Sequence, residues 1–256
     1  MPRRLWLAVG SSLIPLLLLA SCGGDDNAAA TAPAGVSTPG TLAPAQVSPT
    51  AAQPRDTKAE PVLDGPAGKY GILQEDLGTN FLIDFTGTLA LDAKIYGATK
   101  IFPAGTNGQN LLNEWGYLGG FQASFDPEGR QTATLNGGYY LAVESHLFRT
   151  AEGASKAFKF FNSHLAMIKS NQLVTTVSVG NEYQAWYTLG EKIAGSQVNA
   201  VYHRFIFRRG NLVTVVLTSG AEPFMRVDTA RSVAVVIDQK AMGEKPALAP
   251  TPTAKP

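Results

Sequence analysis

The chain has 256 residues, a formal net charge of +1, 45% hydrophobic residues and a single cysteine. The near-neutral balance and the lack of a basic stripe indicate no nucleic-acid partner. A single cysteine excludes an internal disulfide framework, so the folded part depends on its hydrophobic core. The length is sufficient for such a core.

The amino-terminal segment has the pattern of a secretion signal. Arg3 and Arg4 precede an apolar run over residues 5–20, and Ser21 and Cys22 follow it. The run is short for a membrane span, which takes roughly 20 apolar residues, so a cleaved signal is favoured over a permanent anchor. The lone cysteine lies directly after this run, where its thiol can serve as a point of covalent attachment.

The four residues Leu19, Ala20, Ser21 and Cys22 resemble the lipobox of bacterial lipoproteins. The resemblance implies that the chain is cut between Ser21 and Cys22, that the Cys22 thiol takes a diacylglyceryl group, and that the new amine is acylated, for example with palmitate. Because each buried methylene contributes about 0.8 kcal/mol, two or three chains anchor a protein stably. We therefore expect a secreted protein, lipid-anchored to the outer face of the cell membrane or, in a two-membrane bacterium, to the outer membrane. The alternative is an ordinary secreted protein.

Composition divides the chain into four parts. Residues 1–21 are the expected signal peptide, and residues 22–65 join the lipidated cysteine to a segment rich in Ala, Pro and Thr. This segment has almost no large apolar side chains to offset the ordering entropy, so we expect a disordered tether. Residues 66–242 have the composition and size of one domain. Residues 243–256 have the tether's character and are expected to be a disordered tail.

Three helices are predicted within the domain. A short one covers residues 107–115. The clearest follows Thr150, which is suited to be its N-cap, and ends near Asn171. Its apolar stripe is Ala154, Ala157, Phe158, Phe161, Leu165 and Ile168. The third helix covers residues 226–242, and its stripe is Val227, Ala230, Val233, Ala234, Ile237 and Ala241. Both stripes have the helical period, which predicts amphipathic helices that lie on an apolar surface.

The remaining patterned segments are predicted strands, over residues 120–125, 139–148, 174–179, 183–189, 198–208 and 212–218. The last two strands meet at a hairpin signal. A two-residue loop of Gly210 and Asn211 would place Thr214 on the face of Phe205 and Phe207, whereas a three-residue loop over 209–211 makes that face almost wholly apolar. We therefore predict the three-residue loop, with Asn211 in the left-handed conformation.

Several antiparallel strands and two long amphipathic helices predict an α+β fold, a twisted antiparallel sheet packed by the two helices. The segments "LLNEWGYLGGFQASF", "FRTAEGASKAFKFF", "VGNEYQAWY" and "FRRGNLVTVV" are similar to the PsbP-like fold of the photosystem extrinsic subunit and of LpqN-type bacterial lipoproteins. The resemblance spans most of residues 73–242. It implies a PsbP-like sandwich with a first strand pair near residues 72–96, and it brings no catalytic residues.

The residue types that catalysis needs are sparse. His146 shares a strand face with Glu144, and Ser145 lies on the opposite face, where its neighbour cannot activate it. The three histidines are not clustered and no cysteine is free to join them, so no metal site is indicated. There is no nucleophile elbow and no phosphate loop, and the acidic turn at residues 125–131 lacks EF-hand ligands. We predict no catalytic site, no metal site and no cofactor. An envelope enzyme with a site assembled from distant residues is the third hypothesis.

Aromatic side chains are the better lead, because Tyr and Trp combine a large contact area with a polar group. Alternation puts Trp186 and Tyr187 on opposite faces of one strand, so one of the two faces outward. The possible binding surface comprises Trp186, Tyr187, Tyr202 and His203. The predicted function is a non-catalytic binding or assembly domain with an unknown protein or small-molecule partner. The alternative is a small-ligand-binding sensor or transport accessory lipoprotein, which requires a pocket with a few aimed polar side chains.

Overall fold

The computed structural model describes residues 58–78 and 80–248. The signal peptide, the lipobox with Cys22 and most of the predicted tether lie outside the described residues, so these predictions stand as made. No described helix combines the length and the apolar character that crossing a membrane would take.

The described elements are, in chain order, η1 (Ala67–Tyr70), α1 (Gln74–Leu77), β1 (Phe81–Ile83), β2 (Leu89–Leu91), α2 (Ala93–Gly97), α3 (Gly108–Glu114), β3 (Tyr117–Pro127), α4 (Arg130–Leu135), β4 (Tyr139–Phe148), α5 (Ala151–Met167), β5 (Asn171–Val174), β6 (Glu182–Lys192), β7 (Asn199–Arg209), β8 (Leu212–Ala221) and α6 (Val227–Ala241).

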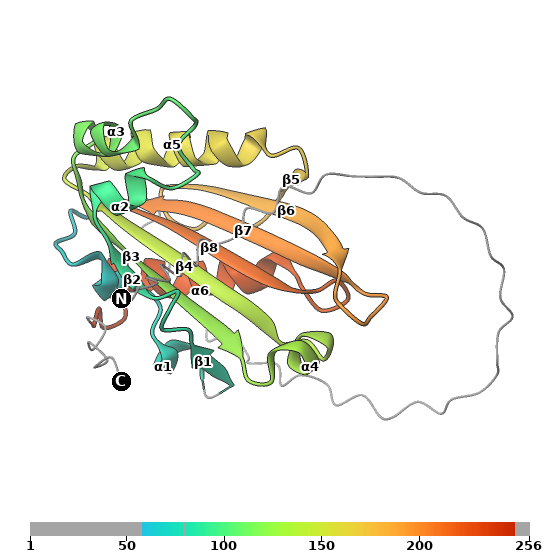
Figure 1. Cartoon of the computed structure of the whole chain (residues 1–256). Helices are drawn as coiled ribbons and strands as arrows, with labels where there is room; N and C mark the ends of the chain where they lie inside the picture. Colours follow the sequence, from blue (N-terminus) through green and yellow to red (C-terminus); the bar gives the residue numbers. More distant parts are fainter. Residues whose placement is uncertain (1–57, 79, 249–256) are drawn as a thin grey trace, which may run out of the picture. The chain divides into compact units, whose positions relative to one another are not determined.

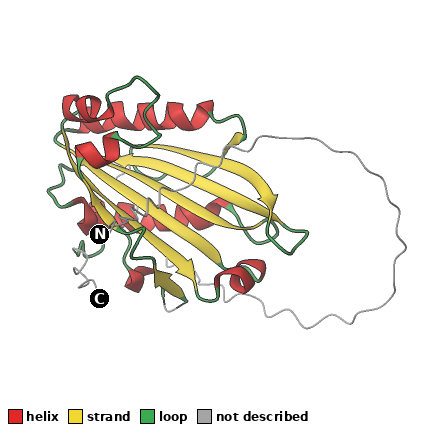
Figure 2. Ribbon diagram, viewed as in Figure 1, coloured by secondary structure: helices red, strands yellow, loops and turns green. Residues whose placement is uncertain are grey.

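One antiparallel sheet organises the domain. Seven of its eight strands follow the order β1-β3-β4-β8-β7-β6-β5, and the eighth, β2, also pairs with β3. Helix α6 packs on one face, and α5 packs on the other together with α2 and α3 (Figures 1 and 2). The predicted fold class, α+β with a large antiparallel sheet and two amphipathic helices, is confirmed. Strands β1 and β2 lie within residues 72–96, where a strand pair is expected, but each of them pairs with β3.

The long helices form where their sequence signals predict. The Thr150 side chain accepts a hydrogen bond from the Gly153 amide at 3.1 Å and thereby caps α5. Most of the predicted stripe of α5 is buried, as is the stripe of α6 from Ala230 to Ala241. The predicted short helix is α3, whose first turn is capped by the side chain of Asn107. Local capping and helical period therefore agree with the tertiary fold here.

The strand predicted over residues 174–179 is wrong in position. The observed edge strand β5 covers Asn171–Val174, and only Val174 is common to both ranges. Beyond it the chain leaves the ladder, and Val179 becomes buried in the core on the α6 side of the sheet. The β-branched composition predicted an extended segment, but burial of one side chain outweighed pairing along the edge.

The predicted register of the last hairpin is also wrong. Arg209 pairs with Leu212, so the loop is the two residues Gly210 and Asn211. The left-handed residue is Gly210, with φ of 54°, and no described residue other than glycine has positive φ. This register places Arg209 on the α6 face, where its guanidinium forms an ion pair of 2.7 Å with Asp238 of α6, both side chains being 1% exposed. A wholly apolar face was not required, because a helix carboxylate compensates the buried cation.

The folded part begins earlier than the predicted boundary at residue 66. The Leu63 amide donates to Asn211 Oδ1 at 2.7 Å, and Asn211 Nδ2 donates back to the Leu63 carbonyl at 3.0 Å. Glu60 forms an ion pair of 2.6 Å with Arg208. Residues 58–65 have only two large apolar side chains, Val62 and Leu63, of which Leu63 packs against the core. Side chains at the tip of the β7–β8 hairpin bind the polar groups of this segment.

Candidate functional site

The two faces of the central strands differ in how far they are covered. On the α6 side, Val201, His203, Phe205 and Phe207 of β7 are all buried. On the α5 side of the same strand, Ile206 is fully buried under α5, whereas Tyr202 and Arg204 are partly exposed. Strand β8 repeats the pattern, with Val213 buried and Val215, Leu217 and Ser219 partly exposed. The α5 face is therefore closed at one end and open at the other.

We call the uncovered part the open face. It consists of Tyr140, Glu144, Tyr202, Arg204, Val215 and Leu217, which all are partly exposed and which the sheet register places on one side of β4, β8 and β7. Helix α5 bounds one end of it, and α4 bounds the other, where the Arg130 guanidinium lies 5.8 Å from the centre of the Tyr140 ring. In Figure 1, α6 lies behind these strands, and α5 lies across only their upper end. The open face combines aromatic, aliphatic and charged side chains.

Arg204 is the notable charge of the open face. Within the described residues its Nη1 donates to the Thr188 hydroxyl at 3.1 Å and to Asn171 Oδ1 at 3.5 Å, and none of the ion pairs there includes it. Burial lowers the pKa of the Arg204 guanidinium below its ordinary value. A guanidinium has five N–H donors, and a largely desolvated cation is costly unless a carboxylate or a similar anion compensates it. Arg204 therefore has donor capacity that the described side chains leave unused.

Glu144 lies on β4, across β8 from the strand of Arg204, and belongs to a polar network that is mostly buried. Its Oε2 accepts from the Tyr96 hydroxyl at 3.2 Å and lies 3.4 Å from His146 Nε2. His146 Nδ1 lies 3.2 Å from the Tyr117 hydroxyl. Burial, followed by the charge of Glu144, raises the pKa of Tyr96 and of Tyr117 well above the ordinary value, so both phenols keep their protons.

The network is closed around the imidazole. His146 is fully buried, whereas the Glu144 side chain is 18% exposed. The Tyr96 ring centre lies 4.2 Å from that of His146. A Cβ at Gly120 would lie 2.5 Å from the Tyr117 hydroxyl, so glycine is needed beside the network. The shared face predicted for Glu144 and His146 is confirmed. In this arrangement the imidazole is enclosed, whereas Glu144 and Tyr117 are partly exposed.

The four side chains predicted as a binding surface are not brought together. Trp186 is buried under α5 and donates from Nε1 to Asn162 at 3.0 Å. Tyr187 and His203 contact each other on the α6 side, and burial lowers the pKa of His203. Only Tyr202 belongs to the open face. His164 projects from α5, and burial lowers its pKa as well. The described residues contain no cluster of three or more His, Cys, Asp or Glu side chains that could hold a metal ion.

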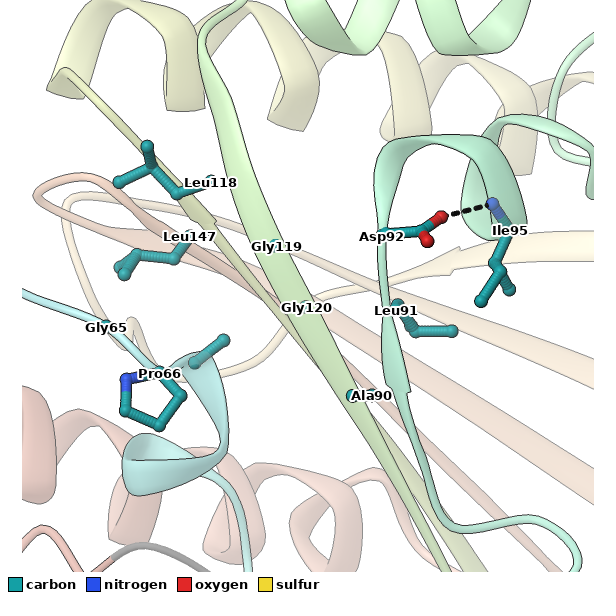
Figure 3. Close-up of a pocket in the computed structure, with 11 residues that line it drawn as sticks. Gly65, Pro66, Ala90, Leu91, Asp92, Ile95, Leu118, Gly119, Gly120 and Leu147 are labelled. Carbon is teal, nitrogen blue, oxygen red and sulfur yellow. Dashed lines mark hydrogen bonds between the residues drawn. The ribbon is translucent and has the colours of Figure 1, made fainter.

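A cleft of about 460 Å³ lies elsewhere, between η1, the end of β2 and the start of β3 (Figure 3). Its lining is mostly glycine and aliphatic side chains, including Leu118 and Ile95, which are about half exposed. Among the described lining residues Asp92 carries the only charge, and its Oδ1 accepts from the Ile95 amide at 2.7 Å as the N-cap of α2. The size suits a small ligand, but the one charged side chain is already committed to the helix.

The sequence matches no family model and no curated protein. Among solved structures, the extracellular domain of PknH from Mycobacterium tuberculosis is similar, with a TM-score of 0.41 and 11% identity over 68% of this chain and 93% of that chain. A Mycobacterium smegmatis protein described as an Rv0999 ortholog has a TM-score of 0.28 and 13% identity over 70% of this chain and 97% of that one. Both TM-scores lie below 0.5, so the functional argument rests on this chain's own surface.

Proposed function

We propose that this protein is a membrane-anchored extracytoplasmic lipoprotein whose domain is a non-catalytic binding or assembly module, and that the open face is its binding surface. The observation that carries the proposal is the change of burial along β7 and β8, from fully covered under α5 to partly exposed at Tyr202, Arg204, Val215 and Leu217. A PsbP-like relationship would agree with such a role.

The surface has the composition of a protein contact. Tyr140 and Tyr202 supply large rings with polar ends, which are enriched in recognition surfaces. Ser219 lies between the two tyrosines on β8, and Leu217 and Val215 follow on the same face of that strand and supply apolar area. The antiparallel sheet holds all of these side chains on hydrogen-bonded backbone, so little conformational entropy is lost when a partner docks.

The buried Glu144–His146 pair does not favour an enzyme over a binding module. Acid–base catalysis requires a group that can reach the substrate proton, and the imidazole here contacts only Tyr96, Tyr117, Glu144 and Phe161 among the ring and hydrogen-bond partners found. The pair is better explained as a polar contact that fixes α2 against the sheet through the Tyr96 hydroxyl.

The anchor is tested by Cys22→Ser. We expect the variant to lose lipid attachment and to leave the membrane fraction for the soluble extracytoplasmic fraction. A variant that is processed and remains membrane-bound as the wild type does would refute the lipoprotein assignment.

The binding surface is tested by placing a photo-cross-linking amino acid at position 217 in cells. The matched control is position 173, another leucine, which is 63% exposed on the edge strand β5. We expect one defined product at position 217, identified by mass spectrometry and abolished by an added Val215→Lys substitution, and none at position 173. Equal products at both positions, or none at 217, would contradict the proposal.

The cleft favours a second candidate function, a small-ligand sensor or transport accessory protein. Native mass spectrometry of the detergent-solubilised protein tests it, with Ala90→Trp as a variant that fills the cleft from an exposed position. A bound small molecule that the variant loses would support the sensor. Ligand-free wild-type protein would leave the assembly module as the better account.

A further inference from the structure

We propose that the partner of the open face presents a carboxylate flanked by apolar side chains, and that this carboxylate binds the Arg204 guanidinium. The inference rests on the proposed function and narrows it to the chemistry of one contact. The partner is a segment of another protein with an aspartate or glutamate between aliphatic or aromatic residues.

The charge of Arg204 has no carboxylate partner within the described residues. Arg204 is partly exposed, yet burial is the main influence on its pKa, and its hydrogen bonds within the described residues come from one nitrogen and go to neutral oxygens. The other largely buried cations of the sheet and of α6 have carboxylates, because Arg208 pairs with Glu182, Arg209 with Asp238 and Lys240 with Asp76. Arg204 is the exception among these cations, and it lies on the open face.

The guanidinium of Arg204 is already oriented by its neighbours on β5 and β6. The Thr188 hydroxyl and the Asn171 side-chain oxygen hydrogen-bond each other, and both accept from Arg204 Nη1, so the guanidinium is held from the β6 side. Its remaining N–H groups stay available to a carboxylate, for which the planar fork is suited. A cation that is already oriented loses less side-chain entropy on binding than a free surface lysine would.

The side chains beside Arg204 on the neighbouring strands are apolar or aromatic. The cross-strand neighbours of Arg204 are Leu217 on β8 and Trp186 on β6. Leu217 is partly exposed, and Val215 lies next to it on the same face of β8 and is also partly exposed. The other charge of the face, Glu144, is engaged by Tyr96 and His146 and lies beyond this apolar strip. A segment that crosses the strip therefore meets one uncompensated cation, which selects a negative group next to apolar ones.

The test uses the full-length protein in detergent and three end-blocked, fluorescently labelled peptides with the same leucine and tyrosine framework. They carry glutamate, glutamine or lysine at the central position, and fluorescence anisotropy measures their binding. We expect the glutamate peptide to bind most tightly. Arg204→Gln should weaken it by roughly tenfold or more, because a desolvated charge pair loses one partner, while the affinity of the glutamine peptide changes little.

The matched control is Arg130→Gln, at the α4 end of the same face, where the arginine is exposed and already paired with Asp126. It removes the same net charge and should change the affinity by less than about twofold. Arg204→Lys keeps the charge and should retain part of the preference. An unchanged affinity of Arg204→Gln for the glutamine peptide shows that its loss of glutamate-peptide binding is not a folding defect.

The inference is overturned if the glutamate peptide does not bind, if the glutamate and glutamine peptides bind alike, or if Arg204→Gln and Arg130→Gln act equally. If cross-linking at position 217 persists in any of these cases, the open face remains the binding surface and only the carboxylate preference falls. If cross-linking fails, the proposed function falls first.

Discussion

The two faces of the sheet are built from the same strands but differ in how far helices cover them. Consecutive residues of β8 show this directly, since Val216 is fully buried against the α6 side and Val215 is partly exposed on the α5 side. The α6 face is covered from His203 to Arg209 along β7, whereas the α5 face is covered only near Ile206 and Arg208. The first face is covered along the strands, and the second leaves part of its surface exposed.

The difference arises from where the helices lie relative to the strands. Helix α6 buries Ala230, Val233, Ala234 and Ile237 against the sheet. Helix α5 shares its face with α2 and α3, whose Tyr96 and Leu112 complete the cluster at one end. The strands extend beyond that end, so alternate residues there have no helix above them. An open sheet face is therefore a consequence of packing that the strand sequences alone do not reveal.

The largest effect is expected from Asp238→Ala on the closed face. The substitution breaks the buried ion pair with Arg209, and breaking such a pair typically costs about 3–5 kcal/mol of unfolding free energy. Urea denaturation measures the change. Asp228→Ala, on the exposed first turn of the same helix, is the control and should cost less than about 1 kcal/mol. Similar losses in the two variants would mean that the ion pair does not hold α6 on the sheet.

A smaller loss of unfolding free energy is expected from alanine substitutions on β8, and its size should differ between the two faces of that strand. Val216→Ala removes buried apolar volume and should cost about 2 kcal/mol, from transfer at about 0.8 kcal/mol per methylene and the cavity that remains. Val215→Ala should cost less than about 1 kcal/mol, because its side chain is already partly in water. Both are measured by the same urea titration. Equal costs would place Val215 in the core and remove the distinction.

The smallest effect concerns pH. Burial lowers the pKa of His203 below its ordinary value of 6.5, so the unfolded chain takes up a proton that the folded protein does not. Stability is then fully present above pH 6.5 and is lost as pH falls from there towards the folded pKa, by about 1.4 kcal/mol for each unit of the shift.

His203→Phe should therefore reduce the stability difference between about pH 7.5 and pH 5, measured by urea unfolding at each pH. His164, whose pKa burial also lowers, keeps its own share of the dependence. His164→Asn should remove that share and serves as the comparison on the α5 side. An unchanged pH dependence in His203→Phe would show that folding does not shift the pKa of this imidazole.

The helices were predictable because their signals are local. The Thr150 cap and the predicted stripe of α5 lie within one stretch of sequence. The cap forms as predicted, and five of the six stripe residues are buried on α5. The strands of the β7–β8 hairpin were also found, but the register required knowledge of both faces. The apolar-face criterion chose the three-residue loop because that register keeps Thr214 off the face of Phe205 and Phe207. Asp238 lies too far along the chain to suggest that it compensates a buried Arg209.

The candidate site was less predictable than the fold. Aromatic alternation identified Tyr202, but it also selected Trp186, which α5 covers, and His203, which lies on the opposite face. Another signal was available in the charged residues Arg204 and Glu144, which lie within the central strands β7 and β4. Their importance depends on how far α5 reaches across the sheet, and that distance is not encoded in any single segment.

The claim that one face is closed and the other open is tested most directly by thiol labelling. Cys22 is the only cysteine of the chain, so a Cys22→Ser background allows single cysteines at positions 217 and 216 to be compared under native conditions. Leu217→Cys should react rapidly with a maleimide, and Val216→Cys should react only at the rate at which the protein opens. Equally slow reaction at both positions would contradict the open face and, with it, the proposed binding surface.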